Sequence, residues 1–251
     1  IPVIVLQTIA ANLGSMFTPI GNPQNLYLFT ASGMPVGTFF LTMLPLTLLS
    51  LALLMLATFR LPAEPIKVQL DSGENAMDGR SVIGYAILFV VNLLVVFRVL
   101  EWIPATVITV VGILLMKKQK LFPQVDYALL LTFIGFFIFV GNLGRIPQIS
   151  TLIANLVQGR EVLVSALFSQ VLSNVPAAIL LSGFTQNFTG LLIGVNIGGL
   201  GTLIASMASL ISYKLYAQEK DSEKGRYMLQ FTLYNVIGLV IMLAVCAIAG
   251  V

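Results

Sequence analysis

Two short segments carry glycine and polar residues inside otherwise apolar sequence, and they match each other. The first is ANLGSMFTPI, beginning at Ala11, and the second is VNIGGLGTLI, beginning at Val195; Asn, Gly, Thr and Ile coincide at four places. Glycine tolerates unwound backbone, and unwinding inside a helix frees carbonyl and amide groups for binding. The pair therefore predicts two broken helices that carry a binding site. The glycines expected to permit the unwound conformation are Gly14, Gly198, Gly199 and Gly201.

The chemistry available at such breaks is ion binding. Freed carbonyl oxygens can coordinate a hard cation such as Na⁺. Amides at the start of the following half-helix carry partial positive charge, which suits an anion. Asn22 before Pro23 is typical of a helix N-cap with proline in the first turn. Asn174 and Val175 before Pro176 suggest a similar cap, although valine caps poorly.

The candidate site residues lie in the two breaks and in a third segment that ends at Pro176. They share small or uncharged side chains, and small residues also serve close helix packing. The predicted substrate-binding residues are Asn12, Gly14, Ser15, Thr18, Asn22, Ser173, Asn174, Val175, Asn196, Gly198, Gly199 and Thr202. Na⁺, the candidate coupling ion, is expected at Asn12, Gly14, Ser173, Asn174, Asn196 and Gly201, and no other cofactor is indicated.

Composition places these segments in a membrane protein. Of the 251 residues, 58% are hydrophobic and 9% are charged, and the mean hydropathy is +0.99. A soluble domain normally carries about a quarter charged residues. The single cysteine, Cys246, excludes an intrachain disulfide, and the absence of histidine excludes His-based catalysis. The net charge of +3 is small and falls in loops, so nucleic-acid binding is not indicated.

Apolar runs of roughly 17–25 residues can cross a bilayer as helices. The expected spans, of which the first and sixth are interrupted, are 1–32, 35–59, 81–98, 102–117, 126–143, 186–217 and 226–250. Three shorter helices are expected between them, at 146–157, 160–173 and 176–184. The first is amphipathic and is interpreted as an interfacial helix. The other two are interpreted as a re-entrant hairpin, 160–184, whose tip is Ser173-Asn174-Val175-Pro176.

The polar segment 61–80 is expected to be a cytoplasmic linker between two halves. Residues 1–60 would end one inverted repeat, and 81–251 would form the second, with three spans, the interfacial helix, the hairpin, the broken helix 186–217 and a final span. Ten of the 13 Lys and Arg residues fall on one predicted side, which the positive-inside rule makes cytoplasmic. Loops 61–80, 117–125 and 218–225 would then be cytoplasmic, with the C-terminus outside.

The acidic residues bear on the coupling ion. All 10 fall in predicted loops or at helix ends, and Asp126 is the closest to a span. Proton antiporters usually carry a carboxylate at membrane depth, so its absence favours coupling through carbonyls and hydroxyls. Repeat symmetry also predicts about 100 residues before Ile1, including a first hairpin that could hold such an acid.

The motifs resemble the ion transporter superfamily, in the branch of arsenite permeases, citrate carriers and divalent anion–sodium symporters. The resemblance is carried by the segments ANLG through GNPQNL, SNVP and GVNIGG. It implies an all-α membrane fold with two inverted repeats, each with a re-entrant hairpin and a discontinuous helix, around one central site. It also implies homodimers and elevator-like movement. Ser173-Asn174 matches the dicarboxylate symporters' hairpin, but Val175 stands where those proteins continue with Thr.

The leading interpretation is a secondary active transporter, not an enzyme, in a bacterial or archaeal cytoplasmic membrane. Its partners would be a small anion, the lipid bilayer and a second copy of the chain. A carboxylate such as citrate or a dicarboxylate is the candidate substrate, coupled to Na⁺ or H⁺. The alternatives are an arsenite or antimonite efflux permease, an Na⁺/H⁺ antiporter, an ion channel, or a membrane-embedded enzyme. The last lacks a histidine, a cysteine pair and an expected buried acid to serve as catalyst.

Overall fold

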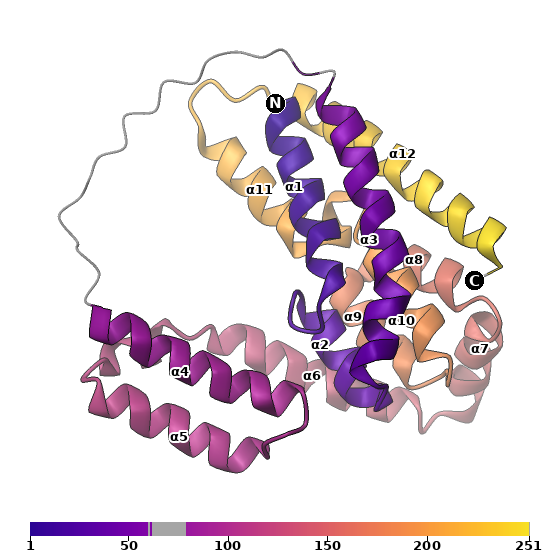
Figure 1. The fold of residues 1–251 in the computed structure, drawn as a ribbon. Coiled ribbons are helices and arrows are strands. Elements are labelled where there is room, and N and C mark those ends of the chain that lie inside the picture. Colours follow the sequence, from indigo (N-terminus) through magenta and orange to yellow (C-terminus); the bar gives the residue numbers. More distant parts are fainter. Residues whose placement is uncertain (60, 62–78, 251) are drawn as a thin grey trace. The chain divides into compact units, whose positions relative to one another are not determined.

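The regular elements of the chain are all helices over the residues that the computed structural model describes, 1–59, 61 and 79–250 (Figure 1). They form two compact units. The larger unit comprises Ile1–Leu61 and Thr132–Val251, and the smaller comprises Pro62–Leu131. The predicted linker 61–80 lies outside the described residues except at Leu61, Gly79 and Arg80.

The larger unit contains both interrupted helices at the expected places. The first consists of α1 (Pro2–Gly14), the 3-10 turn η1 (Ser15–Phe17) and α2 (Pro23–Ser32), followed by α3 (Val36–Thr58). The second consists of α10 (Phe188–Ile197), η3 (Leu203–Ala205) and α11 (Met207–Gln218), followed by α12 (Lys224–Ala249). Between them lie α6 (Tyr127–Leu143), α7 (Pro147–Val157), α8 (Glu161–Leu172) and α9 (Asn174–Ser182).

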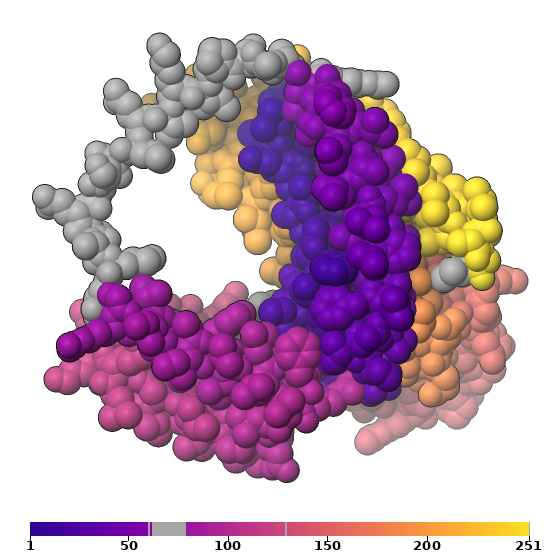
Figure 2. Space-filling view, viewed as in Figure 1, coloured from indigo at the N-terminus to yellow at the C-terminus, as the bar shows by residue number. Residues whose placement is uncertain are grey.

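The packing of the larger unit follows the two breaks. On one side α1 contacts α3, α11 and α12, and Figure 2 shows α1 and α3 lying side by side. On the other side α8, α9 and α2 all contact α10. Phe29 and Phe39 are fully buried where α2 meets α3, and their rings meet edge to face. The breaks are thus enclosed by helices rather than placed on loops.

The smaller unit holds α4 (Gly79–Val96), α5 (Trp102–Leu115), the 3-10 turn η2 (Gln119–Gln124) and the start of α6. The side chain of Leu88 lies against Gly112, and the Asn92 amide donates to the Thr109 hydroxyl at 3.0 Å. At 14 residues α5 is about 21 Å long. That is shorter than the expected span 102–117 and short of a hydrocarbon core of about 30 Å.

Within the described residues, three helices, α3, α4 and α12, are long and apolar enough to cross a membrane. A fourth candidate is the pair Leu130–Leu143 and Pro147–Val157, which is bent by 103°. This bend makes α7 a separate helix, as predicted for 146–157. Each half of the two interrupted helices has fewer than 18 residues, so neither half is long enough to cross a membrane alone.

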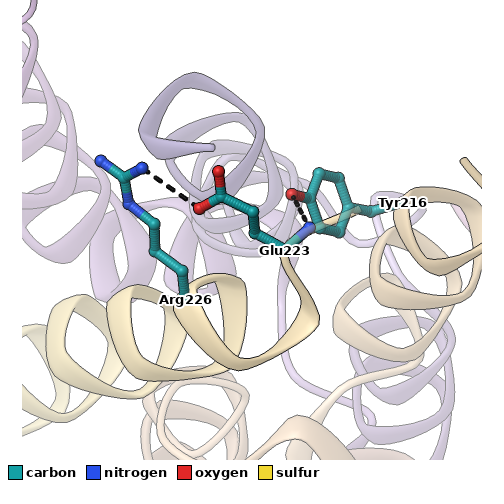
Figure 3. A network of polar contacts seen from close by, with 3 residues as sticks. All are labelled: Tyr216, Glu223 and Arg226. Carbon is teal, nitrogen blue, oxygen red and sulfur yellow. Dashed lines mark hydrogen bonds and ion pairs between the residues drawn. The ribbon is translucent and has the colours of Figure 1, made fainter. Parts of the chain in front are cut away.

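Figure 3 shows polar contacts near the loop that joins α11 to α12. The Tyr216 hydroxyl accepts from the backbone N–H of Glu223 at 3.0 Å, and Glu223 pairs with Arg226 at 3.1 Å. The ion pair is exposed, so it stabilises little. The stronger contact is the Tyr216 ring, which stacks on the buried ring of Tyr227 with centroids 4.7 Å apart.

Candidate functional site

The start of α2 has the predicted cap. Asn22 is the N-cap residue, its Oδ1 accepts from the backbone N–H of Asn25 at 2.8 Å, and Pro23 follows in the first turn. The capping side chain leaves its own amide nitrogen free to donate elsewhere. This nitrogen donates to Ser15 at 3.2 Å, so the cap also ties α2 to the first break.

The predicted cap at the start of α9 is wrong. The N-cap residue is Ser173 rather than Asn174 or Val175, and it has a φ of +76°. Its hydroxyl does not cap the helix but donates to the carbonyl of Ala205 in the second break, at 3.4 Å. The positive φ makes the sharp reversal between α8 and α9, which pack against each other.

Asparagine side chains join the two breaks to each other. The Asn196 amide donates to Asn25 Oδ1 at 2.7 Å, and Asn196 Oδ1 accepts from Asn22 at 3.0 Å. In the other direction the Asn12 amide donates to the carbonyl of Gly199 at 2.6 Å. Each break therefore supplies an asparagine that satisfies polar groups of the other. Asn12 and Asn196 are the matched residues of the sequence repeat, and each bonds to the break that the other belongs to.

The glycines in the breaks differ in what their lack of a side chain allows. Gly201 has a φ of +106°, as predicted for unwound backbone. The prediction is wrong for Gly14 and Gly198, whose φ angles of −67° and −64° are ordinary helical values. Gly198 is needed instead for close packing, because a Cβ there would lie 2.8 Å from Cα of Ala166. A Cβ on Gly199 would collide with Asn12, while one on Gly14 would meet nothing within 4 Å.

Gln170 on α8 holds the second break through hydrogen bonds, and it was not among the predicted site residues. Its amide nitrogen donates to the carbonyls of Gly198 and Leu200, both at 2.9 Å, and its Oε1 accepts from the backbone N–H of Thr202 at 2.8 Å. The exposed Thr202 hydroxyl donates to the Gln170 carbonyl at 2.9 Å. One sequence signal could have found it, because Gln170 lies one helical turn before Ser173.

We expect Gln170→Leu to lower the free energy of unfolding by about 3 kcal/mol or more. The change leaves the carbonyls of Gly198 and Leu200 without this partner, and each buried unsatisfied group costs about 1–3 kcal/mol. Thermal unfolding of the detergent-solubilised protein measures the effect. Gln158→Leu is the control, because Gln158 is exposed. Equal stability of the two variants would show that the hydrogen bonds from Gln170 to the break do not stabilise the fold.

Two residues near the breaks are largely buried but carry amides that stay accessible and make no hydrogen bond to another described residue. Asn174, the first residue of α9, is 4% exposed, and Gln24, in the first turn of α2, is 2% exposed. The two helices pack against each other. An amide side chain offers both a donor and an acceptor, so each of these two can bind a ligand. Helix N-termini carry partial positive charge, so the arrangement can hold an anion.

The remaining predicted site residues differ in their places. Ser15 donates to the Asn12 carbonyl at 2.8 Å and so belongs to the network. The Thr18 carbonyl accepts from Asn25 at 3.1 Å, and Val175 is buried beside Asn174. Gly14 and Thr202 are exposed, so the site as described is built mainly by the other residues.

One acidic residue contradicts the expectation that no acid is buried. Glu161 stands at a helix end, as predicted, but it is only 6% exposed. Its burial depends on contacts with Thr185 and Asn187, which follow about one helical hairpin later in the chain. No local pattern in the sequence indicates that Glu161 meets Thr185 and Asn187.

The apolar helices that are long enough to cross a bilayer are those of an integral membrane protein. Residues 1–188 match the model of the family described as citrate transporter, and the chain belongs to this family.

Two relatives support this membership. The chain is 34% identical over 242 residues to an uncharacterized transporter of Methanocaldococcus jannaschii, an alignment that covers 96% of the chain and 65% of the relative. It is 32% identical over 242 residues to the inner membrane protein YbiR of Escherichia coli, with 93% and 62% covered. The chain thus spans less than two thirds of the length of each relative. No solved structure matches it.

Proposed function

We propose that the protein carries a small anion across the membrane, with a carboxylate such as citrate or a dicarboxylate as its substrate class. The observation that carries the proposal is the pair of accessible amides without a protein partner, Gln24 and Asn174, in the first turns of two helices that pack together. Two amides and two positive helix ends would complement a carboxylate. The family to which the chain belongs is named for citrate transport, which supports the same class.

Coupling to an Na⁺ or H⁺ gradient is the second part of the proposal. Na⁺ prefers carbonyl, hydroxyl and amide oxygens, as hard cations do. The second break offers such oxygens where the Ser173 hydroxyl meets the Ala205 carbonyl, and Asn12 lies at the carbonyl of Gly199. An ion that bound between these groups would hold the tip of α8–α9 on the break.

Movement by elevator-type alternating access is the third part. The order helix, break, helix and long apolar helix occurs twice, in α1–α3 and in α10–α12, which supports inverted repeats. Both breaks belong to one compact unit, which could move as one body against a scaffold. The proposal includes a re-entrant α8–α9 pair, cytoplasmic loops 117–125 and 218–225, an outside C-terminus, and a homodimer in a bacterial or archaeal cytoplasmic membrane.

Uptake into proteoliposomes tests the substrate and the ion together. We expect saturable uptake of radiolabelled citrate or succinate that depends on an inward Na⁺ or H⁺ gradient. Asn174→Ala should raise KM about 10-fold or more, since a hydrogen bond to a charged group contributes about 1.5–3 kcal/mol. Asn142→Ala is the matched control, because the Asn142 amide is exposed and bonds only within its own helix.

Two results would count against the proposal. No uptake of either acid under either gradient would remove carboxylates as the substrate class. Efflux of arsenite by the same vesicles would then favour the permease alternative.

A further inference from the structure

The helices α8 and α10 run parallel in close contact through a glycine face. Gly190, Gly194 and Gly198 recur at every fourth position, the first two within α10 and the third directly after its last residue. A Cβ at these positions would meet, in order, the side chain of Glu161, the backbone of Val162 and the backbone of Ala166. A glycine face allows close approach but offers no side chains that interlock with the partner helix. Side chains of α8 such as Ser165 enter the spaces at these glycines, so packing and directed contacts together set the axial position of α8 along α10.

Glu161 makes such contacts at the base of α8. Its Oε1 accepts from the Thr185 hydroxyl at 2.9 Å and from the backbone N–H of Gly159 at 3.2 Å, and its Oε2 accepts from the Asn187 amide at 3.4 Å. Asn187 in turn caps α10, because its Oδ1 accepts from the backbone N–H of Gly190 at 2.9 Å. One carboxylate thus joins the entry to α8, the loop before α10 and the first turn of α10.

Glu161 is also the only charged side chain that is buried within the described part of the chain. Its hydrogen-bond partners there are neutral, and burial of a carboxylate is costly unless it is well hydrogen-bonded. An apolar residue could fill the same volume at lower cost. The directed hydrogen bonds are what the carboxylate adds.

We propose that Glu161 is a positioning residue that fixes the register of α8 on α10 and so places the tip at the second break. The 12 residues of α8 make a rod about 18 Å long, with Glu161 at one end and Gln170 and Ser173 at the other. A slip of one turn would move the tip by about 5.4 Å, too far for the bonds from Gln170 to the carbonyls of Gly198 and Leu200. The proposal about the register rests only on the contacts of Glu161 and Gln170. Its effect on transport rests on the proposed function.

Hydrogen exchange of the intact protein tests the register without any substrate. We expect Glu161→Ala to speed exchange about 10-fold in residues 170–177 and 198–205, with no change in α4. Thr185→Val should act in the same direction, and the double variant should add little to Glu161→Ala, since both changes remove one shared contact. Glu101→Ala is the control, because Glu101 is exposed.

Citrate uptake supplies a second readout. Glu161→Ala should raise KM about 10-fold while the maximal rate stays within about 3-fold, and Glu161→Gln should restore most of the affinity because it keeps an acceptor for Thr185. Faster exchange confined to 159–161 and 183–190, or equal exchange in Glu161→Ala and the control, would overturn the proposal. If the unaltered protein takes up no citrate, the proposed function fails while the exchange result still decides the register.

Discussion

Gly194→Ala is expected to destabilise the larger unit by about 3 kcal/mol or more and to deplete folded protein from the membrane. The new methyl group would overlap the Ser165 hydroxyl and the Val162 carbonyl and would lie 2.8 Å from Cα of Val162. Overpacking usually costs about 1–3 kcal/mol. Here the obstacle includes backbone, which cannot rotate away, so the two helices must separate. Thermal stability in detergent and the amount of protein in membranes measure the effect.

The same substitution at Gly135 is the matched control. Gly135 lies in the interior of α6, and a Cβ there would meet nothing within 4 Å. Alanine is about 1 kcal/mol more favourable than glycine in a helix, so Gly135→Ala should be neutral or stabilising. If Gly194→Ala were as stable as this control, the close contact between α8 and α10 would be wrong.

Asn196→Leu is expected to reduce citrate uptake on the order of 100-fold while changing side-chain volume little. Asn196 is 2% exposed, and its loss leaves the Asn22 amide and Asn25 Oδ1 without the partners that join the breaks. The buried Asn25 Oδ1, left without a donor, costs about 1–3 kcal/mol, whereas the Asn22 amide keeps its bond to Ser15. The start of α2 would then shift away from the end of α10. Uptake by proteoliposomes, normalised to folded protein, measures the loss.

Asn235→Leu separates this effect from the general loss of a buried amide. Asn235 is 1% exposed, and its amide nitrogen donates only to the Phe231 carbonyl of its own helix, at 2.8 Å. We expect the control to retain most uptake. Equal activity of the two variants would show that the contact between the breaks is dispensable.

Local patterns predicted the local structure well. The cap of α2 was found because an N-cap side chain bonds to a backbone group three residues away, so the signal is contained in Asn22-Pro23. The two interruptions were found because glycine and polar residues inside apolar runs are unfavourable without a purpose. The same reasoning failed at Gly14 and Gly198, where glycine adopts a conformation open to any residue.

Contacts between distant segments could not be predicted in this way. The Ser173 hydroxyl turns to Ala205 and not to its own helix, so a cap rule gave the wrong residue for α9. The roles of Gln170 and Glu161 depend on which helix lies beside α8, and a single sequence holds no record of that neighbour.

The sequence by itself determined that this protein is an apolar helical membrane protein with two interrupted helices and polar residues at each interruption. Hydropathy and helix-breaking residues are properties of a segment, and they act over one or two turns. Only the tertiary structure decided that Asn12 and Asn196 each serve the opposite break, that Gly194 and Gly198 face α8, and that Glu161 is buried. These features arise when helices pack, since a glycine contact or a buried carboxylate is defined by the partner it meets.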